Sequence, residues 1–347
     1  MMKTQCLNSD IISSLPQNII ETILTFMPIR DAVRTSILSK KWRFCWMTMP
    51  KLVFDYDLVR VLSDGRGNRH LTKSKLVNAI FHVLFIHNGP TILEFNFSIN
   101  SLDMVTEFDQ IILYLSRRIN VKHLIINNTP SLYKLPTLFF SLQGLESICL
   151  KDCNFVPPVT FNGFNKLRSM SFKFVQISAK ALQQVLSNCP LLEDMFLYLA
   201  VGGMSNKLPT WLHLRHLTLD LCMRQQGVIS SALCIIKSAP NLERLKILMG
   251  NNVNLTIQDE LSLTFDHLKQ FEMVSYGYNV LMMEFLKLIM AKSPVLELAR
   301  IELSDSVSVE DELKICKEMI FLPLPRASPL GKLVIERRET YSQRLSY

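Results

Sequence analysis

One short apolar pattern recurs along most of this 347-residue chain and constrains its fold more than any other feature. In each copy, an apolar residue is followed three and five positions later by two more. The ten copies are Ile92/Phe95/Phe97, Val121/Leu124/Ile126, Leu145/Ile148/Leu150, Leu167/Met170/Phe172, Leu192/Met195/Leu197, Leu214/Leu217/Leu219, Leu242/Leu245/Ile247, Leu268/Phe271/Met273, Leu296/Ala299/Ile301 and Leu330/Leu333/Ile335. Successive copies start 22 to 34 residues apart. This spacing predicts a solenoid, in which each copy forms a short strand whose apolar residues face a continuous core.

The intervals scatter around the period of leucine-rich repeats, so we assign residues 91–263 to that class of repeat. Helix-period patterns before several strands predict helices over residues 179–186, 231–236 and 282–290. A proline follows each of these helices and prevents it from continuing into the strand. We therefore expect an α/β fold: an irregular leucine-rich-repeat solenoid of about ten strands, which form a parallel sheet on its concave face.

The segment from Leu15 to Trp46 does not follow the repeat. Its apolar residues recur at helical spacing and form a broad stripe, made of Ile19, Ile20, Ile23, Leu24 and Met27. Pro16 suits the first turn of this helix, and Pro28 is expected to end it. Asp31 and Ser39 are expected to cap a second and a third helix. About 35 residues with this much apolar surface cannot bury it internally, so another surface must cover it.

This segment resembles the F-box, the adaptor-binding module of SCF-type ubiquitin ligases. The matching stretches are Leu15-Pro16, the run from 19 to 24, Met27-Pro28-Ile29, and residues 31–43 (DAVRTSILSKKWR), which are closest to the plant version. The resemblance implies a three-helix F-box over residues 10–50 that binds a Skp1-like adaptor and, through it, a cullin. The residues that it places at the adaptor are Leu15, Pro16, Ile19, Ile20, Leu24, Pro28, Val33, Leu38 and Trp42. The alternative, a helical cap on the downstream domain, would need no second and third helix.

Residues 264–336 resemble the FBD region at the carboxyl end of many plant F-box/leucine-rich-repeat proteins. The motifs are Leu268-x-x-Phe271, the run KSPVLE at 292–297, and the run PRASP at 325–329. The chain departs from that pattern in the Leu-Pro-Leu-Pro doublet at 322–325. We expect this region to close the solenoid as its terminal cap. The remaining divisions are a flexible lead over residues 1–14, a linker and solenoid N-cap over 51–90, and a tail over 337–347.

The composition limits the cellular setting without selecting a ligand. Lysine and arginine exceed aspartate and glutamate by 38 to 30, a balance of +8 that is spread along the chain. The eight cysteines form no Cys-x-x-Cys pair, and residues 1–14 lack the apolar stretch of a signal peptide. No apolar run approaches the roughly 18 to 20 residues that span a bilayer. We expect reduced cysteines, a cytoplasmic or nuclear protein, and no membrane partner.

The sequence offers no arrangement of residues that indicates a catalytic or metal site. Cys149 and Cys153 are four residues apart, but the repeat explains Cys153, because that position commonly holds asparagine or cysteine, as Cys222 also does. A zinc site would need four ligands in close pairs. His213 and His216 lie on a predicted turn-to-strand segment that does not place them on one face. No nucleophile motif or phosphate-binding glycine loop is present. We therefore expect no enzyme, no metal and no cofactor.

The strand residues that alternate with the core positions are expected to face solvent and to bind a target protein. The candidates are Lys151, Lys173, Phe196, Tyr198, His216, Asp220, Arg244 and Lys246. Aromatic residues ringed by charge have the usual composition of a binding hot spot. Two alternatives stay open: Phe196 and Tyr198 could pack against a neighbouring loop, and the basic residues could hold an anionic ligand, as in hormone-sensing relatives of this architecture.

The resemblance implies that the chain is the substrate-recognition subunit of an SCF-type ubiquitin ligase, with no bond chemistry of its own. The F-box would bind the adaptor, and the repeats would bind a target protein whose identity the sequence does not give. The alternative is a basic leucine-rich-repeat scaffold that binds nucleic acid or another protein outside any ligase. Nucleic acid is the less expected partner, because no base-reading motif accompanies the positive charge.

Overall fold

The chain folds into two compact units, Met1–Cys153 and Asn154–Tyr347, which are described separately. The computed structural model describes residues 11–63, 69–99, 105–117, 121–127, 133–199, 208–221, 227–249, 264–278, 280–321 and 326–337. Most of the predicted lead and tail, and the proline doublet at 322–325, lie outside these residues. None of the helices in the described ranges combines the length and the apolarity that crossing a bilayer requires.

The first unit begins with a small bundle of short helices. Its elements are α1 (Ile11–Ser14), α2 (Gln17–Thr25), α3 (Ile29–Arg34) and the 3-10 helices η1 (Thr35–Ile37) and η2 (Trp42–Thr48). Pro16 and Pro28 each immediately precede a helix, with extended backbone angles. Pro28 therefore starts α3, and the expected cap Asp31 lies inside the first turn of that helix. There its negative charge faces the positive end of the helix dipole, and it pairs with Arg30 at 2.8 Å.

The segment after the bundle changes from strand to helix within a few residues. Strand β1 covers Lys51–Phe54, and helix α4 covers Tyr56–Leu62. The Asp55 carboxylate accepts a hydrogen bond from the Leu58 backbone N–H at 3.2 Å and thereby caps α4. Strand β1 pairs in parallel with β2, so residues 51–54 supply a strand of the sheet.

The rest of the first unit alternates helices with strands. Its elements are α5 (Arg69–Ile86), β2 (Glu94–Phe97), α6 (Val105–Ser116), β3 (His123–Asn127), β4 (Tyr133–Lys134), η3 (Thr137–Ser141), β5 (Ser147–Lys151) and β6 (Cys153–Asn154), the last of which ends in the second unit. Strands β1, β2, β3 and β5 form a parallel sheet in that order. Met49, Leu52 and Phe54 are buried at the spacing of the repeat, so an eleventh copy precedes the ten recognised in the sequence.

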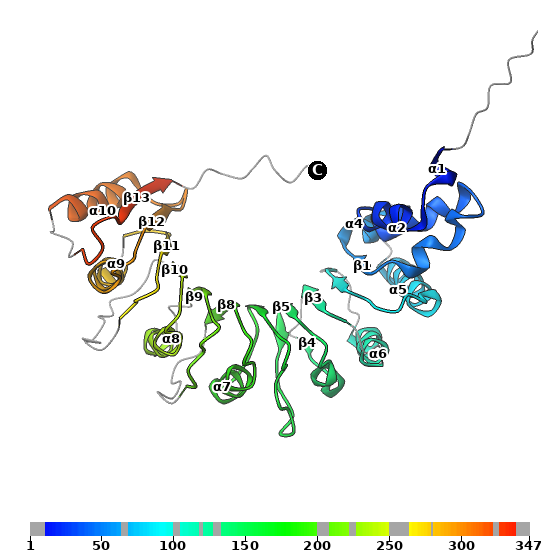
Figure 1. Cartoon of the computed structure of the whole chain (residues 1–347), viewed down its shortest axis with the longest axis horizontal. Coiled ribbons are helices and arrows are strands. Elements are labelled where there is room, and N and C mark those ends of the chain that lie inside the picture. Colours follow the sequence, from blue (N-terminus) through cyan, green and yellow to red (C-terminus); the bar gives the residue numbers. More distant parts are fainter. Residues whose placement is uncertain are drawn as a thin grey trace, which may run out of the picture. The chain divides into compact units, whose positions relative to one another are not determined.

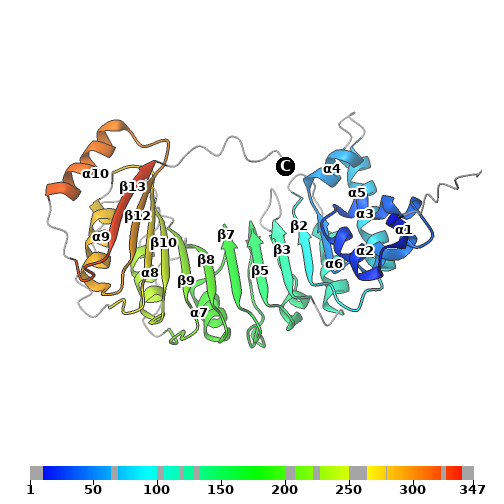
Figure 2. The same cartoon turned by 45° about the horizontal axis from the view of Figure 1, so that its top comes forward.

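The second unit continues the alternation. Its further elements are β7 (Ser169–Lys173), α7 (Ala179–Ser187), β8 (Asp194–Leu199), β9 (His216–Leu221), α8 (Val228–Lys237), β10 (Arg244–Met249), β11 (Gln270–Ser275), α9 (Val280–Lys292), β12 (Leu298–Leu303), α10 (Val309–Phe321) and β13 (Lys332–Arg337). Strands β7 to β13 are parallel and lie side by side in chain order (Figure 2). Helices α7, α8 and α9 lie on one side of these strands (Figure 1) and confirm the three predicted helices. The predicted fold class, an N-terminal helical segment followed by parallel-sheet repeats, is confirmed.

The repeat residues form the core of both units. In nine of the ten predicted copies all three apolar side chains are at most 3% exposed. The tenth copy differs: Leu330 is 82% exposed, and Leu333 and Ile335 are only half-buried. Strand β13 is the last strand of its sheet, so only one neighbouring strand, β12, covers these side chains. The expectation that Leu330 faces the core is therefore wrong.

Charged residues that immediately precede the strands of the second unit alternate in sign from one repeat to the next. The series is Arg168, Glu193, Arg215, Glu243, Lys269 and Glu297. Each backbone N–H in the series donates to the carbonyl of the member before it, at 2.8 to 2.9 Å. Glu243 makes ion pairs with Arg215 and, at 3.2 Å, with Lys269. Alternating charges at this position favour the correct pairing of neighbouring repeats.

Candidate functional site

Helix α2 carries more apolar surface than the bundle covers. Ile20 and Leu24 are fully buried against the rest of the bundle. Beside them on the same helix, a second row remains in solvent: Pro16, Ile19, Ile23 and Phe26, which we call the α2 outer stripe. Residues three, seven and ten apart lie along one side of a helix, so these four form a continuous surface. Phe26, at the end of the stripe, is 85% exposed.

The segment from η1 to η2 adds further exposed apolar residues. Ile37 is 87% exposed, and Leu38 and Phe44 are each more than half exposed. Trp42 and Trp46 are buried instead, and the Trp42 indole N–H donates to the Ile12 carbonyl at 3.3 Å. The Trp42 backbone N–H lies 3.4 Å from the Ser39 hydroxyl, as expected of a cap.

The structure divides the nine residues predicted at the adaptor into two groups. Pro16, Ile19, Pro28 and Leu38 are exposed, and Leu15 and Val33 are partly exposed. Ile20, Leu24 and Trp42 are buried and contact other parts of the bundle, so they support the exposed surface from beneath. Phe26, Ile37 and Phe44 were not among the residues predicted at the adaptor. Phe26 could have been found, because it lies seven residues after Ile19 and so on the same side of the helix. No comparable pattern marks Ile37 and Phe44.

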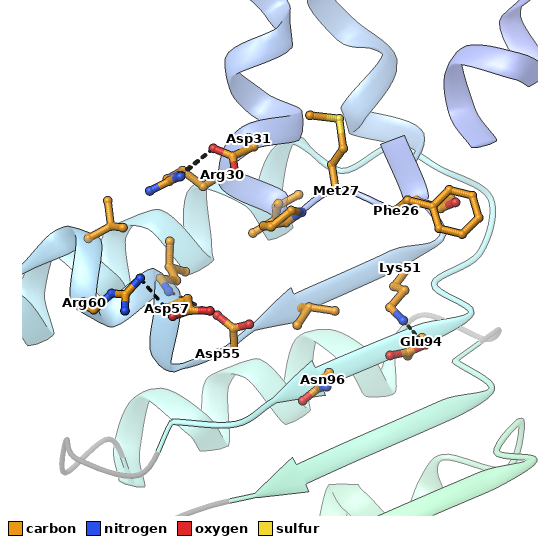
Figure 3. Close-up of a pocket in the computed structure, with 16 residues that line it drawn as sticks. Phe26, Met27, Arg30, Asp31, Lys51, Asp55, Asp57, Arg60, Glu94 and Asn96 are labelled. Carbon is orange, nitrogen blue, oxygen red and sulfur yellow. Dashed lines mark hydrogen bonds and ion pairs between the residues drawn. The ribbon is translucent and has the colours of Figure 1, made fainter. Parts of the chain in front are cut away.

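A pocket of about 600 Å³ lies beside the turn between α2 and α3 (Figure 3). Residues from that turn, including Pro28, form part of its lining, and residues of β1, α4 and β2 form the rest. Six of its seven charged side chains form pairs: Arg30 with Asp31, Arg60 with Asp57 at 3.6 Å, and Lys51 with Glu94 at 3.0 Å. The seventh, Asp55, accepts a hydrogen bond from the Leu58 backbone N–H. The polar wall next to the apolar turn therefore carries four carboxylates and three cations, most of them in pairs.

In the second unit, the predicted target-binding residues lie on one face of the strands. Phe196 and Tyr198 alternate with buried positions of β8 and are both partly exposed. The Lys173 ammonium lies 5.2 Å from the centre of the Phe196 ring, and the Tyr198 ring contacts Phe174, with ring centres 4.4 Å apart. Phe174 belongs to the turn after β7, so Tyr198 does contact a neighbouring loop, and its binding of a target stays a prediction.

Most of the basic residues predicted on this face are already paired. Lys246 contacts Glu272 at 2.8 Å and Glu302 at 3.7 Å. His216 pairs with Asp194 on the adjacent strand. Arg244 is exposed and makes no ion pair with the described residues. In the first unit, Lys151 lies 3.8 Å from Asp152. Because carboxylates lie against three of the five predicted basic residues, the geometry favours neither a phosphate site nor a nucleic-acid surface.

Asp220 differs from the other acidic residues of the strand face in the second unit. It is half-buried, and among the described residues it makes no ion pair or hydrogen bond. Burial raises the pKa of its carboxyl above the ordinary value. Its neighbours in the sheet register are Tyr198 on β8 and Leu248 on β10, neither of which carries a charge.

The cysteines of the described ranges occupy structural positions. Cys153 is fully buried, as the repeat predicts, and burial raises the pKa of its thiol to about 12. Cys149 is partly exposed on β5. Cys6 and Cys222 lie outside the described residues. Across the part of the chain that the structure describes, no three His, Cys, Asp or Glu side chains gather where they could hold a metal ion.

Comparison with known proteins identifies both parts of the chain. Residues 12–54 match the family described as "F-box domain", and residues 112–258 match that described as "FBD-associated F-box protein At5g56370, LRR repeats". The first range contains the whole α2 outer stripe, and the second contains Phe196, Tyr198 and Asp220. Neither match extends into residues 264–336, so the bounds of the FBD-like region stay a prediction, as do the other domain bounds.

Individual relatives agree with these matches. The chain is 27% identical to the Arabidopsis thaliana F-box/FBD/LRR-repeat protein At1g13570 over 94% of its own length and 98% of that protein. It is 28% identical to F-box/LRR-repeat protein 25 of the same plant, over 55% of this chain and 68% of that protein. The chain therefore carries an F-box followed by leucine-rich repeats of the FBD-associated type, as the resemblance in its sequence predicted.

Proposed function

We propose that this protein is the substrate-recognition subunit of an SCF-type ubiquitin ligase. Its F-box binds a Skp1-like adaptor and, through it, a cullin, while the strand face of its repeats binds a target protein for ubiquitination. Proteins that combine an F-box with leucine-rich repeats act in general as non-catalytic substrate adaptors. On this proposal the protein works in the cytoplasm, the nucleus or both.

The α2 outer stripe is the observation that carries this proposal. A surface helix normally hides its apolar side, and exposed apolar residues that adjoin one another usually mark a binding site. Here a single short helix leaves four of them in solvent, within the segment that matches the F-box. A partner that buried Ile19, Ile23 and Phe26 would gain roughly 1.5 to 3 kcal/mol for each side chain.

The repeats contribute by holding the target near the ubiquitin-charged enzyme. Holding two reactants in one complex raises their effective concentration, and this can accelerate a transfer without any catalytic side chain on the holder. The paired charges and aromatic groups of the strand face are suited to protein contact.

A pull-down of the full-length chain with a purified Skp1-like adaptor tests the proposal. We expect Ile19→Asp with Ile23→Asp to weaken adaptor binding by at least about 100-fold, because two apolar contacts are lost and charges are buried in their place. Leu15→Ala with Pro16→Ala should also abolish capture and leave the repeats folded.

The matched control for this experiment is Leu212→Asp with Val159→Asp, which puts the same two charges at exposed apolar residues of the second unit. It should bind the adaptor as the unmodified chain does. Unchanged adaptor capture by the Ile19/Ile23 variant, with an intact fold by circular dichroism, would refute the assignment.

A further inference from the structure

The strand face of the second unit holds one aromatic cluster with an unpaired acid beside it. The Phe174 and Tyr198 rings contact each other with their centres 4.4 Å apart and their planes inclined at 45°. Asp220 is in register with Tyr198 on the neighbouring strand. Adjacent strands are roughly 4.8 Å apart, so the Asp220 side chain lies next to the Tyr198 ring on the same face.

The backbone at Phe174 is strained, because phenylalanine rarely adopts the conformation found at this turn position. Its φ angle is 52°, a left-handed conformation that bulky residues rarely adopt. Asp152 holds the equivalent turn position after β5, with a φ of 53°, and aspartate tolerates this conformation better. Phe174 is nonetheless half exposed. An exposed ring held at a strained position is typical of a contact residue rather than a core residue.

The charges around this cluster leave a negative group without a partner. Lys173 is held over the Phe196 ring, and Lys246 is engaged by Glu272 and Glu302. Asp194 is paired with His216. A half-buried carboxylate without a cation is unfavourable, and a partner that supplied one would remove that penalty.

We propose that the Phe174–Tyr198–Asp220 cluster binds an arginine side chain of the target protein. The planar guanidinium lies against the two rings, and its N–H groups donate to the Asp220 carboxylate. Leu248, on the other side of Asp220, covers the methylene groups of the arginine. Arginine fits this site better than lysine, because its planar group stacks on aromatic rings and can donate two parallel hydrogen bonds to a carboxylate. This inference rests on the proposed function and specifies the target: a protein that presents an arginine side chain.

A peptide library with one randomised central position and constant flanks tests this inference on the full-length chain. We expect the unmodified protein to enrich arginine over glutamine about ten-fold at that position, with lysine in between. Asp220→Asn should remove the preference and should not lower the thermal unfolding midpoint at pH 7, because it replaces a buried charge with a neutral amide of the same shape. Asp194→Asn, which removes a paired acid from the adjacent strand, should keep the preference.

Phe174→Gly separates a binding role of the ring from a structural one. Glycine adopts the left-handed conformation without strain, so the unfolding midpoint should be retained while the arginine preference falls to that of Asp220→Asn. Failure of the unmodified protein to prefer arginine, a preference for acidic residues, or a preference that survives in Asp220→Asn would each overturn the inference.

Adaptor capture measured on the same four preparations keeps this inference separate from the ligase assignment. If all four capture the adaptor but none prefers arginine, the arginine site is refuted and the ligase role stands. If none captures the adaptor while the preference depends on Asp220, the ligase role is refuted and the arginine site stands.

Discussion

Glu243 makes ion pairs with two other members of the series of charged residues that precede the strands of the second unit. It accepts hydrogen bonds from Lys269 and from Arg215, one on each neighbouring repeat. These two contacts hold the pKa of its carboxyl below the ordinary value of 4.5. The folded state therefore favours the ionised form. The resulting stabilisation is complete above pH 4.5 and is lost as the pH falls through the lower folded-state pKa.

We predict that Glu243→Gln lowers the free energy of unfolding by about 0.5 to 1 kcal/mol at pH 7, as expected of a networked surface pair. The difference from the unmodified chain should shrink as the pH falls below 4.5, and also in high salt. Urea unfolding across that pH range measures it. Glu297→Gln is the control, since Glu297 holds the next position in the series and makes no ion pair with the described residues. An equal effect in both variants would contradict the prediction.

At the residue scale, the sequence predicted accurately which side chains face the core. It predicted less accurately which contacts the exposed side chains make. Lys173 and Lys246 could be placed on the strand face by alternation alone. Their partners could not, because the pairing depends on which residues the neighbouring repeats bring into register. Phe174 was missed because its ring reaches Tyr198 only through a left-handed backbone conformation that no local pattern indicates.

At the scale of the element, the same position of the repeat can be buried or exposed, depending on the neighbouring strands. The first apolar position of the pattern is Leu214 in one repeat and Leu330 in the last, and their exposed fractions are 0% and 82%. The two residues have the same chemistry and the same place in the pattern. Their surroundings differ, since β9 has a neighbouring strand on both sides and β13 on one side.

We predict that Leu214→Ala lowers the free energy of unfolding by about 2 to 5 kcal/mol, because it leaves a cavity in the packed core. Leu330→Ala should change it by no more than about 0.5 kcal/mol, as expected at an exposed position. Chemical unfolding followed by circular dichroism measures both. Comparable losses in the two variants would show that the last repeat is as well covered as the inner ones.

The sequence predicted most strands and helices because the apolar spacing that defines them is also what buries them. The prediction from the sequence failed where one structural element directly adjoins another. Met49 to Phe54 carries the repeat pattern but adjoins the F-box, so it was assigned to a linker. Asp55, an N-cap directly after β1, starts α4 within the range that was assigned to a linker. On α2 the broad apolar stripe was recognised, but which half of it is covered depends on the packing of η2, which the sequence does not give.

At the scale of the whole molecule, the two units have different surfaces. The first unit carries the uncovered stripe of α2 and is suited to a permanent apolar partner. The second carries a strand face on which most charges are paired and on which Phe174 and Tyr198 lie beside Asp220. The proposed function requires this division, because an adaptor and a target protein would contact surfaces of different chemistry.

Hydrogen–deuterium exchange of the full-length chain, with and without a saturating Skp1-like adaptor, tests the central claim most directly. We predict slower exchange over α2 and the following turn, residues 17–28, because a partner covers the α2 outer stripe. Exchange over β7 to β9 should not change. Binding of the adaptor with no added protection of α2, or with protection confined to the second unit, would contradict the account.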